Sequence, residues 1–176
     1  MAFSCVAPGV DETALPGESA RTLVSRLASA KATAVASQHP QAWVIGSDQV
    51  AVRVDDAKLE WVMGKPKTAT RCEEQLQSCS GRSLSFVTAV AVMNEDSGAL
   101  IEFMDTTRVV FRVLDPATIK RYVSKEQPLD CAGGFKSEGL GITLCESIES
   151  ADPSALIGLP LIRLSAALRQ AGYELP

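Results

Sequence analysis

A carboxylate, an amide and a lysine stand out in the sequence because their spacing suits chemistry on a polyanion. Asp48 and Gln49 follow an apolar run at 43–45, and Lys65 follows a second apolar run at 61–63. Buried apolar runs bounded by glycine or serine are typical of strands in parallel or mixed sheets. In such sheets ligands bind beyond the carboxyl ends of the strands. These residues therefore suit a metal-bound polyanion, unless Asp48 only opens a turn and Gln49 lies at the surface.

A glycine-rich segment at 131–141 is a second candidate for ligand contact. It holds Lys136 and Glu138 among its glycines, and closely spaced glycines let a backbone approach a ligand. The segment has neither the G-x-G-x-x-G spacing of dinucleotide sites nor the Walker A pattern. The alternative interpretation is a mobile surface loop.

Composition restricts the class of protein. The chain has 176 residues and a net charge of −4, with 46% hydrophobic and 5% aromatic residues. These values predict one domain with an aliphatic core. The mild acidity argues against a nucleic-acid polymer as partner. No apolar run is long enough to span a membrane, and the start does not resemble a signal peptide.

The residue types that bind zinc are poorly arranged for it. The five cysteines form no C-x-x-C pair, and His39 is the only histidine. Reduced thiols in a cytoplasmic protein are therefore expected. His39 precedes Pro40 in a loop that ends a helix, and we expect it to be structural or exposed rather than catalytic.

Hydrophobic spacing and turn residues predict the elements that position these side chains. Thr68 and Asp115 are the expected N-terminal capping residues of two of the predicted helices. The predicted helices lie at about 18–37, 68–79, 117–124 and within 153–170. The predicted strands lie at 1–6, 43–45, 50–54, 84–93, 99–103, 107–113 and 142–144, with turns at 55–57 and 94–98.

An ordered set of short motifs resembles the Maf-like nucleotide pyrophosphatases. The matching segments lie at 10–12, 26–32, 45–49, 64–66, 80–81 and 158–161, which covers nearly the whole chain. Ser47-Asp48-Gln49 and the segment 135–139 resemble the subgroup that acts on 7-methyl-GTP. The related dTTP/UTP subgroup usually has Asp-Thr after the strand, and glutamine where Glu138 stands.

The resemblance implies an α/β fold like that of the Maf and inosine-triphosphatase proteins. This fold has a mixed sheet, flanking helices and a cleft between two lobes. The implied reaction is hydrolysis of a nucleoside triphosphate to the monophosphate and pyrophosphate. The implied cofactor is a divalent metal cation, Mg²⁺, Mn²⁺ or Co²⁺, and the family allows a homodimer. A dTTP/UTP pyrophosphatase and a non-catalytic nucleotide-binding regulator of cell division remain alternatives.

The resemblance also implies a role for each matching residue. Asp48 matches the catalytic acid of the family, its proton acceptor, while Gln49 and Glu138 match positions that set base specificity. We expect Asp48 and Glu12 to hold the metal. The polar residues expected to line the cleft are Glu12, Lys31, Lys65 and Lys136. From the helical pattern alone, the favoured interpretation of Lys31 is a solvated cation on the outer face of the helix.

The sequence departs from the family pattern at its N-terminal end. Family members begin with a strand and a Ser-rich, Arg-containing loop that grips phosphates, and Met1 aligns just beyond that loop. We therefore expect residues 1–176 to form a single Maf-like domain that lacks the first strand and the Ser/Arg loop.

Overall fold

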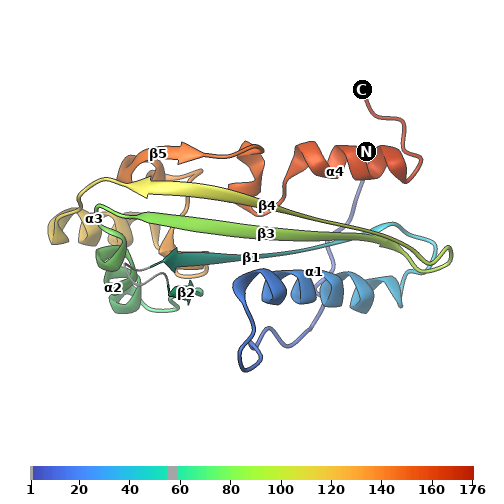
Figure 1. Cartoon of the computed structure of the whole chain (residues 1–176), viewed down its shortest axis with the longest axis horizontal. Coiled ribbons are helices and arrows are strands. Elements are labelled where there is room, and N and C mark those ends of the chain that lie inside the picture. Colours follow the sequence, from blue (N-terminus) through green and yellow to red (C-terminus); the bar gives the residue numbers. More distant parts are fainter. Residues whose placement is uncertain (1, 55–58) are drawn as a thin grey trace.

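The computed structural model describes residues 2–54 and 59–176, which form a five-stranded sheet flanked by helices (Figure 1). The strands are β1 (Val44–Val54), β2 (Glu60–Met63), β3 (Ser83–Asn94), β4 (Ala99–Phe111) and β5 (Cys145–Glu149). The α-helices are α1 (Ala20–Ala36), α2 (Ala69–Cys79), α3 (Pro116–Glu126) and α4 (Leu161–Gln170). Three short 3₁₀ helices are η1 (Ala132–Gly134), η2 (Leu140–Leu144) and η3 (Pro153–Ile157). The predicted α/β fold with flanking helices is confirmed.

The sheet order is β2-β1-β3-β4-β5, and each described pair of neighbouring strands is antiparallel. Strand β1 runs through Gly46 without a break and pairs Asp48 with Ala89 of β3. The prediction that a strand ends before Asp48, and that a separate strand follows at 50–54, is therefore wrong. Glycine usually weakens a strand, but here the pairing with β3 continues from Val44 to Val52.

Helix α1 covers one face of the sheet (Figure 1). Helix and strand approach each other closely at Gly46. A Cβ atom at Gly46 would lie 2.3 Å from the carbonyl oxygen of Ala28 and 2.6 Å from the amide nitrogen of Ala32. Only glycine fits this contact. Lys31 precedes Ala32 on α1, and Asp48 lies two positions after Gly46 on the same face of β1. The contact at Gly46 therefore also brings Lys31 close to Asp48.

The opposite face carries two apolar clusters with polar residues between them. Helix α4 packs on Val90 and Val92 through Leu164, Ala167 and Leu168. Helices α2 and α3 lie towards the other end of β3 and β4 (Figure 1). There a second cluster of buried residues surrounds three aromatic rings. Those rings belong to Phe86, Phe111 and Phe135. The buried polar residues between the clusters include Thr88, Asp105 and Thr107.

The predicted helices are confirmed, together with the capping residues Thr68 and Asp115. The side chains of Ser19, Thr68 and Asp115 each accept a hydrogen bond from a backbone amide in the first turn of α1, α2 and α3. The predicted hairpin of β3 and β4 is also confirmed, although β4 is one strand rather than two segments. No helix in the described part of the chain is long and apolar enough to cross a membrane.

Two other predicted strands are wrong. Residues 2–19 form neither helix nor strand, and Met1 lies outside the described residues. Residues 142–144 belong to η2, and the sheet resumes only at Cys145. The predicted turn at 55–57 lies outside the described residues.

We predict that Gly46→Ala destabilises the protein, because the new methyl group forces α1 away from β1. Overpacking of this kind costs about 1–3 kcal/mol or more. The change is measured as the free energy of unfolding in urea. Gly64→Ala is the matched control, since a Cβ atom there meets no atom within 4 Å. Equal stability of the two variants would contradict the close contact at Gly46.

Candidate active site

Lys31 lies between the carboxylates of Asp48 and Glu12. Its Nζ is 2.6 Å from Asp48 Oδ1 and 2.6 Å from Glu12 Oε1. Lys65 Nζ lies 3.8 Å from Glu12 Oε2. The folded chain therefore brings together four of the predicted site residues, from α1, β1, the N-terminal segment and the connection after β2. We call Glu12, Lys31, Asp48 and Lys65 the charged cluster.

The charged cluster has an inner and an outer part. The side chains of Asp48 and Lys31 are only 9% and 16% exposed, whereas those of Glu12 and Lys65 are each 47% exposed. Asp48 is fixed by the pairing of β1 with β3, where it lies opposite Ala89. Lys31 is fixed by α1, which packs on β1. A ligand can therefore reach the buried pair from the side of Glu12 and Lys65.

Burial and neighbouring charge shift the pKa values of Asp48 and Lys31 in opposite directions. Burial raises the pKa of the Asp48 carboxyl above its ordinary value, and the hydrogen bond and charge of Lys31 offset only part of this effect. Burial lowers the pKa of Lys31, but hydrogen bonds to Asp48 and Glu12 outweigh it, and its pKa is raised. The hydrogen bond from Lys31 also lowers the pKa of Glu12. A carboxylate with a raised pKa is a stronger base than an exposed one.

Gln49 faces the side of the sheet opposite to Asp48, since side chains alternate along a strand. Its Nε2 donates hydrogen bonds to Thr88 Oγ1 at 2.8 Å and to the carbonyl oxygen of Ala155 at 2.9 Å. The same nitrogen lies 3.3 Å from the carbonyl oxygen of Leu156. Gln49 therefore fastens η3 to the sheet. The amide nitrogen of Gln49 thus already donates hydrogen bonds to protein acceptors. Its role in base specificity stays a prediction.

Lys136 and Glu138 lie in a different polar cluster, built on α3. Lys136 Nζ is 3.0 Å from Glu126 Oε1, and the other oxygen of Glu126 accepts a hydrogen bond from the Leu140 amide at 2.7 Å. The Tyr122 hydroxyl accepts a hydrogen bond from the Lys136 amide at 3.1 Å. These contacts fix the backbone on both sides of Glu138, whose side chain is exposed.

The sequence analysis did not identify Glu126, Tyr122 or Thr88. Tyr122 and Thr88 occupy ordinary inner positions of a helix and a strand, where an aromatic residue or a threonine needs no special explanation. Glu126 ends α3 and resembles a surface charge. Its proximity to Gly139, where a Cβ atom would lie 2.5 Å from the Glu126 carboxylate oxygens, is visible only in three dimensions.

The charged cluster contains the type of oxygen ligand that divalent cations take. The carboxylates of Asp48 and Glu12 converge on one positively charged atom, Lys31 Nζ, each at 2.6 Å. Mg²⁺ is commonly bound by one or two carboxylates together with phosphates and water. In residues 2–54 and 59–176, no group of three or more His, Cys, Asp or Glu side chains is gathered as a metal site. A metal here would therefore take its other ligands from phosphate and water.

Fold and site together define a class of protein: a mixed α/β protein with an acid and a lysine buried together on one face of an antiparallel sheet. The chain belongs to the Maf family, since the sequence model described as Maf-like protein matches residues 1–171.

Curated relatives match almost the whole chain. A protein of Xanthomonas campestris pv. campestris strain 8004 is 50% identical over 174 residues, which cover 99% of this chain and 88% of the relative. A protein of Alkalilimnicola ehrlichii is 52% identical over 166 residues, covering 94% of this chain and 81% of the relative. A Pseudomonas aeruginosa protein is 46% identical over 174 residues, covering 99% and 88%. Each of these relatives is named 7-methyl-GTP pyrophosphatase.

We predict that Lys31→Met raises the pKa of Asp48 further, because the ammonium that opposes the effect of burial is removed. The folded state then binds the Asp48 proton more tightly than the unfolded state does. The free energy of unfolding should therefore fall more at neutral pH than at acid pH.

A carboxyl NMR titration measures the pKa of Asp48 directly, and urea unfolding at several pH values measures the stability. Lys120→Met on α3 is the control, since Lys120 is exposed. An unchanged pKa of Asp48 in Lys31→Met would show that the two groups are not electrostatically coupled.

Proposed function

We propose that the protein hydrolyses 7-methyl-GTP to 7-methyl-GMP and pyrophosphate with the help of a divalent cation. The observation that carries the proposal is the buried Asp48–Lys31 pair, in a chain whose relatives are named for this activity. The proposed cofactor is Mg²⁺, Mn²⁺ or Co²⁺. A cytoplasmic location and a homodimeric state stay predictions from the sequence.

Hydrolysis of a phosphoanhydride requires a water molecule held in line and neutralised charge on the phosphoryl oxygens. In the proposed mechanism Asp48 accepts a proton from the attacking water, a role that its raised pKa favours. Lys31 transfers its contact from Asp48 to a phosphate oxygen, which frees the carboxylate. Lys65, half-exposed at the rim of the charged cluster, neutralises a second phosphate.

The proposed metal ligands are the carboxylates of Asp48 and Glu12. When bound, the cation supplies positive charge to the phosphoryl oxygens and helps to orient the triphosphate. Glu12 is suited to this role because it is ionised and half-exposed, so it can leave Lys31 without a large rearrangement of the core.

Glu138 is the proposed reader of the base. Guanine presents adjacent N–H donors on its pairing edge, and one carboxylate can accept hydrogen bonds from both. Methylation at nitrogen seven adds positive charge to the ring, which a carboxylate also favours. Lys136 is engaged by Glu126, and Glu138 remains exposed. The carboxylate of Glu138 is thus accessible to a base.

Asp48→Asn should lower pyrophosphate release from 7-methyl-GTP by about 10²–10⁴-fold, the range that general-base catalysis supplies. The folded structure should persist, since asparagine has nearly the same shape. Release of pyrophosphate is followed with Mg²⁺ present and after chelation. Asp96→Asn, in the exposed turn between β3 and β4, is the control. Near-normal turnover by Asp48→Asn would exclude Asp48 as the base.

Glu138→Gln should weaken hydrolysis of 7-methyl-GTP more than hydrolysis of UTP, because glutamine offers both a donor and an acceptor and so suits a pyrimidine. The ratio of kcat/KM values for the two nucleotides measures the effect. Equal losses on both substrates would count against direct reading of the base by Glu138.

A panel of nucleoside triphosphates tests the substrate itself. Preference for dTTP or UTP by the unmodified chain would replace the proposed substrate with that of the related subgroup. Nucleotide binding without metal-dependent release of pyrophosphate would favour a non-catalytic regulatory protein.

A further inference from the structure

Glu12 differs from Lys31 and Asp48, the buried members of the charged cluster, because no helix or strand holds it. Residues 2–19 form neither, while Lys31 and Asp48 are parts of α1 and β1. Half-exposed ion pairs of this kind contribute little to stability by themselves. What holds its neighbours in the segment 11–19 therefore bears on the position of Glu12.

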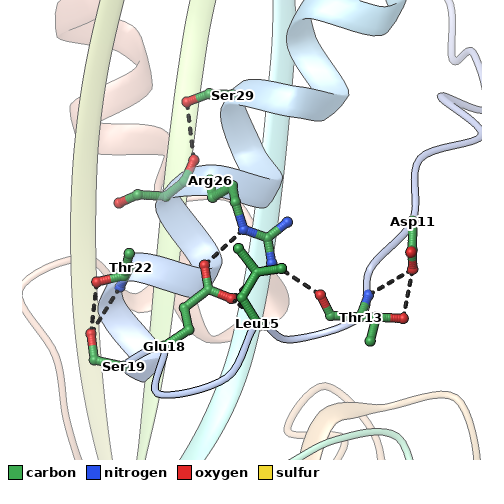
Figure 2. A network of polar contacts seen from close by, with 9 residues as sticks. Asp11, Thr13, Leu15, Glu18, Ser19, Thr22, Arg26 and Ser29 are labelled. Atoms are coloured by element: carbon green, nitrogen blue, oxygen red, sulfur yellow. Dashed lines mark hydrogen bonds and ion pairs between the residues drawn. The ribbon is translucent and has the colours of Figure 1, made fainter.

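Arg26 of α1 makes those contacts, as Figure 2 shows. Its Nε donates to Glu18 Oε1 at 2.7 Å, and its Nη2 donates to Glu18 Oε2 at 2.8 Å. The same Nη2 donates to the carbonyl oxygen of Thr13 at 3.1 Å. Paired hydrogen bonds between a guanidinium and a carboxylate are strong, and they fix the relative orientation of the two groups. Arg26 thus holds the residue after Glu12 and also the residue that leads into α1.

Between Thr13 and Glu18, Leu15 is hydrogen-bonded to both the carboxylate and the backbone of Glu18. Glu18 Oε2 accepts a hydrogen bond from the Leu15 amide at 3.0 Å, and the Glu18 amide donates to the Leu15 carbonyl oxygen at 3.0 Å. On the other side of Glu12, the Asp11 carboxylate accepts from the amide and hydroxyl of Thr13 at 2.9 and 2.6 Å (Figure 2). Both neighbours of Glu12 are therefore held in place.

Burial and ionisation favour a permanent contact between Arg26 and Glu18. The Glu18 side chain is only 4% exposed. Hydrogen bonds from Arg26 and the Leu15 amide lower the pKa of Glu18 from 4.5 to about 2. The pair therefore contributes its full stability above pH 4.5 and loses it as the pH falls towards 2. At neutral pH the contact is complete.

We propose that Arg26 is a positioning residue that keeps Glu12 at the charged cluster by fixing Glu18 and the Thr13 carbonyl. Arg26 lies five residues before Lys31 on α1, a distance of about 7.5 Å along the helix axis. One helix thus supplies both the residue that fixes the segment and the ammonium that Glu12 contacts. The consequence for metal use rests on the function proposed above.

The first measurement needs no activity. In Arg26→Ala, hydrogen exchange at the Leu15 and Glu18 amides should accelerate by about fivefold or more, because the segment opens more often. Exchange at strand amides of the core, such as that of Val90, should stay slow. Arg21→Ala is the matched control, since it removes an exposed arginine from the same helix. Unchanged exchange at Leu15 in Arg26→Ala would overturn the proposal.

The second measurement concerns the use of metal. In Arg26→Ala, the Mn²⁺ concentration that gives half-maximal pyrophosphate release should rise by about fivefold or more, with a smaller change in the KM for nucleotide. Arg26→Lys, which keeps the charge but not the paired hydrogen bonds, should be intermediate. Adding Arg26→Ala to Glu12→Gln should have little further effect, because the two changes act through one group. Additive losses would overturn the proposal.

These two measurements also distinguish a failure of the role proposed for Arg26 from a failure of the proposed function. If the unmodified chain releases no pyrophosphate, the proposed function fails and hydrogen exchange still decides the role of Arg26. If Arg26→Ala does not fold, Glu18→Gln replaces it, since this change weakens the same contact without altering the shape of the side chain. Rapid exchange at Leu15 in Glu18→Gln is the expected result, and unchanged exchange would again overturn the proposal.

Discussion

The contact between the backbones of α1 and β1 at Gly46 is the constraint on which the charged cluster depends. It sets the distance between a helix and a strand, and so it sets the distance between Lys31 and Asp48. At 2.6 Å these groups form a hydrogen-bonded ion pair, and Asp48 stays largely buried beside it. Burying a carboxylate is costly unless it is paired. Pairing therefore offsets part of the cost of burying Asp48, and the same burial raises the pKa on which the reactivity proposed for Asp48 depends.

The two faces of β1 serve different purposes. One face carries Asp48 towards α1, and the other carries Gln49 towards η3, where hydrogen bonds to Thr88 and Ala155 bind the C-terminal part of the chain to the sheet. The glycine-rich segment is anchored separately, by Glu126 and Tyr122 of α3. Asp48 and Lys31, proposed to act on phosphate, are therefore held by β1 and α1, whereas contacts from α3 fix the backbone on both sides of Glu138, the proposed reader of the base.

Local features of the sequence were the most predictable. Helices α1, α2 and α3 begin after Ser19, Thr68 and Asp115 because capping depends on neighbouring residues alone. The course of β1 was not predictable, because Gly46 resembles a strand terminator unless the helix packed on it is known. Pairing between strands far apart in the sequence, such as β1 and β3, is likewise a long-range property that periodicity does not contain.

The candidate site was predictable only in part. The family resemblance singled out Glu12, Lys31, Asp48 and Lys65, and the fold gathers them, although helical spacing alone left Lys31 a solvated cation. The contacts of Arg26 and Glu126 were not predicted, since ordinary charged residues acquire their roles through tertiary contacts. Neither the metal-binding role of Asp48 and Glu12 nor the specificity role of Glu138 follows from geometry alone.

The central claim is that metal and triphosphate bind over the buried Asp48–Lys31 pair. The most direct measurement is paramagnetic broadening of backbone NMR signals by Mn²⁺, in the presence of a non-hydrolysable analogue of 7-methyl-GTP. The account predicts the strongest broadening at residues 12, 31, 48 and 65. Strong broadening elsewhere, with the signals of Asp48 and Lys31 unaffected, would contradict it.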